Sequence, residues 1–97
     1  MILVKIHKTE TSEIIAVCDA ELIGKRFEEG NLALNITENF YKGKNLPKKE
    51  IIHLLEESRN VSIVGKESIQ LALDHKIIDE MNVITIQGIP HAQMFSL

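Results

Sequence analysis

Strand-like and helix-like segments follow one another along this chain in an order that leaves few architectures open. Residues 2–7 and 12–18 are rich in aliphatic and β-branched side chains and are separated by a short polar break. They are therefore expected to form two paired strands, a hairpin at the front of the chain. Only one clean strand–helix–strand unit follows this hairpin. A doubly wound parallel sheet would need several such units, so a mixed sheet is predicted instead.

The spacing of apolar residues predicts the remaining elements. Three further strands are expected at 32–36, 61–64 and 83–86. Two amphipathic helices are expected, one at 47–59, where Pro47 suits the first turn, and one at 67–75. Asp19 is expected to cap a short helix over 20–25, because its carboxylate can accept the free N–H groups of a first turn.

The predicted fold is a single α+β domain over residues 1–97. It is a two-layer sandwich with a mixed β-sheet of about five strands, two main helices and one short helix. The residues expected to face a shared core are Ile2, Val4, Ile6, Ile14, Ala16, Leu34, Ile63 and Ile84 in the strands, with Leu55 and Leu73 in the helices.

Composition limits the class of protein. The 97 residues are 44% hydrophobic and 26% charged, values typical of a globular domain, and the net charge of −3 argues against a general nucleic-acid coat. The longest apolar runs have four or five residues, far below the roughly 20 needed to cross a bilayer. Cys18 is the only cysteine, which excludes an internal disulfide, and the four histidines are too scattered to predict a metal site. A cytoplasmic protein outside any membrane is expected.

The first candidate site is the segment 88–93, which contains Pro90, His91 and Gln93. Glycine gives the backbone freedom and proline fixes φ, so His91 and Gln93 would project polar groups from a rigid corner. Histidine is the side chain best suited to exchange a proton near neutral pH. The plainer interpretation is a turn at the end of a strand, whose histidine bonds a carbonyl group.

The second candidate is the pair Cys18 and Asp19, at the junction between a strand and the short helix. A thiol beside a helix N-terminus would have a lowered pKa, and Cys18 with His91 would then form a nucleophile–base pair. The plainer interpretation is that Cys18 is a small core residue at the end of a buried strand.

The third candidate is a run of four lysines, Lys42, Lys44, Lys48 and Lys49, in a segment without any acidic residue. Lys48 and Lys49 fall in the first turn of the helix begun by Pro47, where the helix dipole disfavours cations. Such a departure from a local rule can mark a binding site, and lysines with nearby aromatic rings at 40–41 would suit a phosphate or an RNA backbone. The plainer interpretation is a solvated surface run.

Several stretches of the chain occur together in a known family. These are 1–7, 16–25, 28–30, 64–65 and 88–93, with Cys18-Asp19 and Pro90-His91-Ala92-Gln93 as the most specific. In them the chain resembles the short archaeal proteins known as domain of unknown function 424, over nearly its full length. The resemblance implies an archaeal source and a two-layer α/β sandwich, and by analogy alone an association with the translation apparatus, but no activity.

Two functions from different classes therefore stay open. One is a non-enzymatic accessory protein that binds RNA or a translation-related ribonucleoprotein through the lysine run or the 90–93 segment. The other is a small enzyme or small-ligand binder that uses Cys18, Asp19 and His91. Aromatic residues make up only 4% of the chain and no second titratable cluster accompanies Cys18, so a closed catalytic pocket is hard to assemble. The binding protein, without a cofactor, is favoured.

Overall fold

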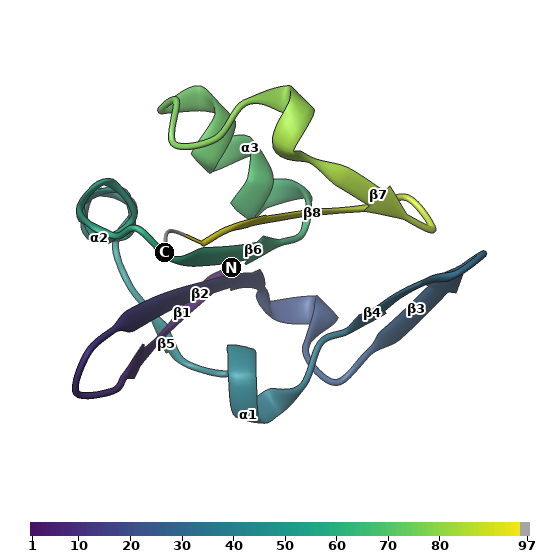
Figure 1. The fold of residues 1–97 in the computed structure, drawn as a ribbon, viewed down its shortest axis with the longest axis horizontal. Coiled ribbons are helices and arrows are strands. Elements are labelled where there is room, and N and C mark those ends of the chain that lie inside the picture. The colour runs from purple at the N-terminus through teal and green to yellow at the C-terminus, as the bar shows by residue number, and fades with distance from the viewer. Residues whose placement is uncertain (96–97) are drawn as a thin grey trace.

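A six-stranded mixed sheet forms the centre of the molecule in the computed structural model, which describes residues 1–95 (Figure 1). In spatial order the strands are β5 (Lys44–Asn45), β1 (Ile2–Lys8), β2 (Glu13–Asp19), β6 (Val61–Val64), β8 (Ile89–Met94) and β7 (Ile84–Ile86). Strands β2 and β6 are parallel, and the other neighbours are antiparallel. The predicted α+β fold with a mixed sheet is confirmed, but the sheet has six strands instead of about five, and β5 and β8 were not predicted.

The front hairpin has the predicted form. Strands β1 and β2 pair over their whole length, from Ile2 opposite Asp19 to Lys8 opposite Glu13. The β-branched residues of both strands favour this extended backbone, and β2 lies inside the sheet because β6 pairs with its other side. The end of β2, where Cys18 and Asp19 lie, is thereby fixed in the middle of the molecule.

Two helices cover one face of the sheet, as Figure 1 shows. They are α2 (Lys48–Glu57) and α3 (Lys66–Asp74), and a turn of 3-10 helix, η2 (Glu80–Asn82), follows them. The residues buried between this face and the helices include Ile2, Val4, Ile15, Val17, Ile51, Leu55, Ile63, Ile69, Ala72 and Ala92. Within residues 1–95, no helix has the length and apolar character needed to cross a membrane.

Smaller elements cover part of the other face. They are the 3-10 turn η1 (Ala20–Leu22), the short helix α1 (Glu38–Tyr41) and a separate two-stranded hairpin of β3 (Arg26–Glu29) and β4 (Leu32–Asn35). The residues buried beneath them are Ala16, Cys18, Leu22, Leu34, Ile36, Tyr41, Val64 and Ile86. The strand predicted at 32–36 thus belongs to its own small sheet.

The expected core needs corrections at several positions. Ala16 and Leu34 are buried, but beneath the hairpin face and not beneath the main helices. Ile6 is 41% exposed and Ile84 is 49% exposed, while Ile14 is half-buried. Alternation along a strand shows which residues share a face, but it does not show how far the covering elements extend over that face.

The largest difference from the prediction is strand β8. Gln87 and Gly88 both have positive φ, 50° and 78°, and form a two-residue turn that pairs Ile86 with Ile89. Such turns match the twist of the strands that they join. The chain therefore reverses and runs back between β7 and β6. Pro90 lacks a backbone N–H and argues against an interior strand, which is why β8 was not predicted.

Candidate functional site

Cys18 and His91 lie in one row across the sheet. Cys18 is paired with Val64 of β6, and Val64 is paired with His91 of β8. The two backbones are thus two strand spacings apart, roughly 10 Å. The two segments lie close together because β7 runs parallel to β2 and the turn after it brings β8 back alongside β6.

The Cys18 thiol has the opposite character to the one considered from the sequence. Its side chain is fully buried, at 0% exposure, and its Sγ donates a hydrogen bond to the Asp19 carbonyl oxygen at 3.2 Å. Burial, together with the nearby charge of Asp19, raises the pKa of Cys18 to about 12. The thiol is therefore protonated near neutral pH and cannot act as an activated nucleophile.

His91 is also an interior residue. Its side chain is 8% exposed, and its Nε2 atom is buried without a hydrogen-bond partner. Burial lowers the pKa of His91, which keeps the imidazole neutral at physiological pH. Val64 stands between Cys18 and His91 in the row, so the structure does not assemble a nucleophile–base pair.

The predicted corner at 90–93 is instead an ordinary part of β8. Neighbouring residues of a strand point to opposite faces, and Ala92 accordingly packs under the helices, on the face opposite to His91. Gln93 is exposed, and the Pro90 carbonyl oxygen accepts a hydrogen bond from the Gly65 N–H at 2.9 Å. The polar groups of this segment therefore do not converge on one point.

Asp19 caps a helix, but not the one predicted. The expected helix over 20–25 is the single turn η1, and Asp19 makes no side-chain bond to it. Its carboxylate points to the helical face, where Oδ1 accepts hydrogen bonds from the Ser68 N–H at 2.8 Å and the Ser68 hydroxyl at 2.6 Å. Oδ2 accepts one from the Glu67 N–H at 3.0 Å. Asp19 therefore caps α3, 48 residues further along the chain.

Gly65 makes this contact possible. It precedes α3 with φ 109°, and a Cβ atom there would lie 2.3 Å from the Cγ atom of Asp19. Only glycine leaves room for the carboxylate and adopts this backbone conformation without strain. Cys18-Asp19 and Val64-Gly65, two of the stretches that carried the family resemblance, thus meet in one structural junction.

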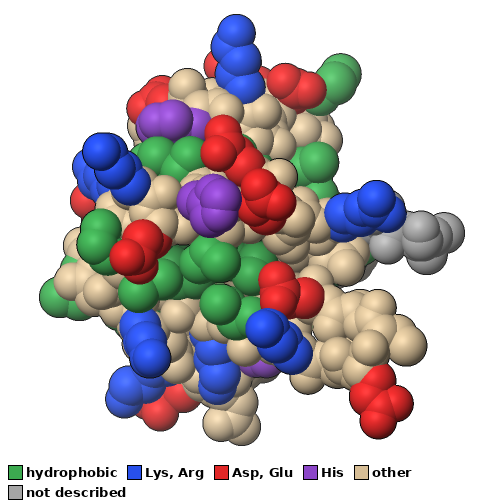
Figure 2. Space-filling view, turned by 90° about the vertical axis from the view of Figure 1, so that its left-hand side faces the viewer, with side chains coloured by type: hydrophobic (Ala, Val, Ile, Leu, Met, Phe, Trp, Pro, Cys, Tyr) green, Lys and Arg blue, Asp and Glu red, His purple; other side chains and the backbone are tan. Residues whose placement is uncertain are grey.

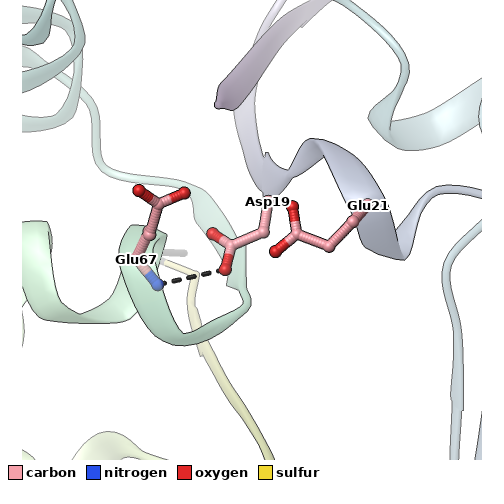
Figure 3. A group of neighbouring side chains, drawn as sticks. All are labelled: Asp19, Glu21 and Glu67. Carbon is pink, nitrogen blue, oxygen red and sulfur yellow. Dashed lines mark hydrogen bonds between the residues drawn. The ribbon is translucent and has the colours of Figure 1, made fainter.

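The only group of metal-type ligands that lie together within residues 1–95 surrounds this junction. Asp19, Glu21 and Glu67 have carboxylate oxygens within 4.8 Å of one another. Figure 3 shows the three side chains, which come from the end of β2, from η1 and from the start of α3. The Glu67 carboxylate accepts a hydrogen bond from the Met1 amine at 3.1 Å, and this bond raises the pKa of the amine. Since Asp19 already accepts three hydrogen bonds and Glu67 has a cationic partner, the group has a structural explanation.

The four lysines of the third candidate all lie at the surface around one edge of the sheet. Lys42 ends α1, Lys44 lies in β5, and Lys48 and Lys49 begin α2. Each is exposed, and none forms an ion pair within the described part of the chain. These ammonium groups are therefore free to meet a ligand.

The aromatic residues beside the lysines do not point outward, which corrects the idea of a stacking platform. The ring of Phe40 stacks on His7 with centroids 4.6 Å apart. Tyr41 is buried, its hydroxyl lies 2.7 Å from the Ser62 hydroxyl, and burial raises its pKa. Both rings support the packing of α1, so they are not free to stack on bases.

The structure also shows a surface feature that was not predicted. A groove of about 540 Å³ lies between β1, β5 and α2, and Ile6, Leu46 and Leu54 contribute its apolar surface. Lys44 and Lys49 line the same groove. Because Ile6 alternates with Val4, the sequence pattern places it in the core, and this expectation concealed the groove.

Comparisons with known proteins agree with this fold. The crystal structure of an uncharacterized conserved protein from Methanopyrus kandleri is similar with a TM-score of 0.79 and 26% sequence identity, and the match covers 96% of this chain and 89% of that one. Among curated proteins, none matches. A family model matches residues 7–97, nearly the whole chain. The chain therefore belongs to the family described as "Protein of unknown function (DUF424)".

Proposed function

We propose that this protein is a cytoplasmic, non-enzymatic accessory protein of an archaeal cell that binds RNA or a translation-related ribonucleoprotein. The observation that carries the proposal is the group of four exposed lysines, Lys42, Lys44, Lys48 and Lys49, without any ion-pair partner in the described residues. The whole chain has a net charge of −3, so this concentration of positive charge is local.

Phosphate contact is the chemistry that such a surface offers. Lysine ammonium groups bind phosphate as point charges, and each contact releases counterions from the nucleic acid. Since Phe40 and Tyr41 both pack inward, the proposed contact is to the backbone and not to stacked bases. It is expected to show little preference for sequence and strong dependence on salt.

The alternative, a small enzyme or small-ligand binder built on Cys18, Asp19 and His91, finds less support. The thiol has a pKa of about 12, Asp19 is engaged by α3, and His91 is buried in the row beyond Val64. No observation brings a substrate to these three groups, so the binding protein is the better proposal.

The test is a titration of a fluorescently labelled single-stranded uridine-rich RNA at several salt concentrations. Binding should weaken as salt rises, and changing all four lysines to Gln should flatten the logarithmic salt slope by about 2.8, because each lysine–phosphate pair accounts for about 0.7 of that slope. The matched control changes four lysines elsewhere to Gln, which gives the same net charge: Lys8, Lys25, Lys66 and Lys76. Absence of binding at low salt, or equal slopes for both variants, would contradict the proposal.

A further inference from the structure

We propose that the groove between β1, β5 and α2 is a docking site for a short acidic, amphipathic segment of a protein partner. The groove consists of Ile6 in β1, Leu46 before α2 and Leu54 in α2, with Lys44 and Lys49 at its border. The proposal goes beyond RNA binding, since Lys42 and Lys48 do not line the groove and its apolar residues make no phosphate contact.

The groove exists because the elements that cover β1 do not extend along its whole length. Strand β5 pairs only with Leu3 and Val4 of β1, so the strand continues past its neighbour. Ile6 points to the same face as Val4, yet Val4 is 3% exposed and Ile6 is 41% exposed. Figure 2 shows hydrophobic side chains gathered at the centre of this side of the molecule, with Lys or Arg side chains below them and Asp, Glu and His side chains beside and above them. A contiguous apolar patch with a polar rim is typical of an interaction site.

The residues that line the groove indicate which kind of molecule fits it. The apolar part is aliphatic, and the nearby Phe40 ring stacks on His7 outside the groove lining, so a base would find no ring to stack on. Aliphatic or aromatic side chains of a peptide would fill the same space and bury Ile6 and Leu54. The occupant is therefore a protein segment.

The charged residues of the groove also limit which partners can bind. Lys44 and Lys49 border the groove, and neither forms an ion pair in the described part of the chain. Glu50 is the only acidic residue of the lining, and His53 is also present. The two lysines are positioned to pair with carboxylates beside the apolar anchors, which favours acidic partners and raises the rate of encounter.

The experiment selects ligands without assuming a partner. A display library of random twelve-residue peptides is bound to the full-length protein at about 150 mM salt. At this salt concentration, exposed charges more than roughly 8 Å apart are largely screened from one another, so unspecific charge attraction is weak. The enriched peptides are synthesised, and their affinity is measured by fluorescence anisotropy. We expect them to combine two or more large apolar residues with Asp or Glu. Enrichment of basic or purely polar peptides, or no enrichment, would overturn the proposal.

Matched variants locate the binding. Ile6→Thr should weaken the selected peptide about tenfold by loss of buried apolar area, whereas Ile84→Thr, at a similarly exposed residue of the opposite edge strand, should change it less than about twofold. Lys49→Gln should weaken it about threefold and Lys48→Gln should not, because Lys49 lines the groove and Lys48 does not. Equal effects within either pair would overturn the proposal.

Two further outcomes would show that something other than a partner peptide occupies the groove. A concentration-dependent dimer in sedimentation, abolished by Ile6→Thr, would show that a second copy of the chain covers the groove. Amide shifts of Ile6 and Leu54 on addition of the uridine-rich RNA, with displacement of the peptide, would assign the groove to RNA. Failure of RNA binding alone would leave the groove proposal intact, since the RNA test depends on Lys42 and Lys48 as well.

Discussion

The junction around Asp19 and the groove beside β5 are opposite in character, although both contain charged residues in places where such residues are uncommon. At the junction, a carboxylate that is 2% exposed accepts three hydrogen bonds from α3. At the groove, Lys44 and Lys49 have no ionic partner within residues 1–95 and border an open aliphatic surface. Within the described residues, the Asp19 carboxylate at the junction is therefore paired by the fold itself, whereas the two lysines at the groove have no ionic partner.

This difference separates structural from functional explanations of unusual residues. A buried charged group persists only where hydrogen bonds compensate for the hydration that it gives up, so Asp19 and Gly65 are explained completely by the fold. Exposed lysines at a helix N-terminus and exposed aliphatic residues on a core-facing strand position gain nothing from the fold. The unexplained region is the better place to look for function.

The largest effect should come from Gly65→Ala, which we expect to lower the free energy of unfolding by at least about 3 kcal/mol. The new Cβ would lie 2.3 Å from the Asp19 Cγ atom, at φ 109°. The measurement is urea unfolding. Gly24→Ala is the control, because Gly24 has φ 85° but open space around the position of a Cβ, and it should cost less.

A double-variant cycle sharpens this prediction. The cost of Gly65→Ala should fall when Asp19 is also changed to Ala, because the clash with the carboxylate is then removed. Strictly additive costs would show that the two residues do not interact and would contradict the junction as described.

Asp19→Ala should come next, with a loss of about 2–3 kcal/mol, because it leaves the first N–H groups of α3 and the Ser68 hydroxyl without their charged acceptor. Asp19→Asn keeps one acceptor oxygen and should lose less. Urea unfolding of both variants is the measurement. A change below about 0.5 kcal/mol for Asp19→Ala would place Asp19 among ordinary surface residues.

His91 should make stability depend on pH. Burial holds the pKa of His91 in the folded protein below its ordinary value of 6.5, so at lower pH the unfolded chain binds a proton that the folded chain does not. Stability is therefore lost as the pH falls below about 6.5, with a slope of up to about 1.4 kcal/mol per pH unit from this group.

The measurement compares the wild type with His91→Gln by urea unfolding between about pH 7.5 and pH 5. The difference between the two curves isolates His91 from the other titrating groups. The wild type should lose more stability than the variant as the pH falls, and parallel curves would contradict the buried, neutral imidazole.

The smallest effect is expected at the lysines. Lys42→Gln and Lys44→Gln should change the free energy of unfolding by less than about 0.5 kcal/mol. Lys48→Gln should raise it by a few tenths of a kcal/mol, because a cation leaves the first turn of α2. Thermal unfolding at low salt detects such changes best. A loss above about 1 kcal/mol would mean that these lysines support the fold and have no need of a ligand.

Much of the architecture was predictable from local pattern. The front hairpin, the strand at 61–64 and the helices α2 and α3 follow from runs of β-branched residues, helical spacing and Pro47. Strand β3 was not predicted, because its end overlaps a stretch with the composition of a turn, and β8 was missed because Pro90 and the Gln87–Gly88 turn obscured it. Turn geometry and strand pairing depend on partners elsewhere in the chain, which local spacing does not reveal.

The candidate sites show the same division. The period of a strand already implies that Cys18 and Asp19 point to opposite faces of the sheet. The sequence alone therefore argues against one site that contains both side chains. That Asp19 reaches Ser68 could not be predicted, because 49 residues separate them. The groove at Ile6 was hidden for a related reason, since alternation does not show where β5 and α2 end.

The sequence by itself determined the class of fold, the order of its main elements and the concentration of lysines at 42–49, because composition and short-range periodicity are encoded locally. The tertiary structure alone decided the rest: that Cys18 and His91 are buried, that Asp19 caps α3, and that Ile6 lies open beside Lys44 and Lys49. Burial and hydrogen bonding are properties of contacts between distant parts of the chain, and these contacts form only when the sheet brings its strands together.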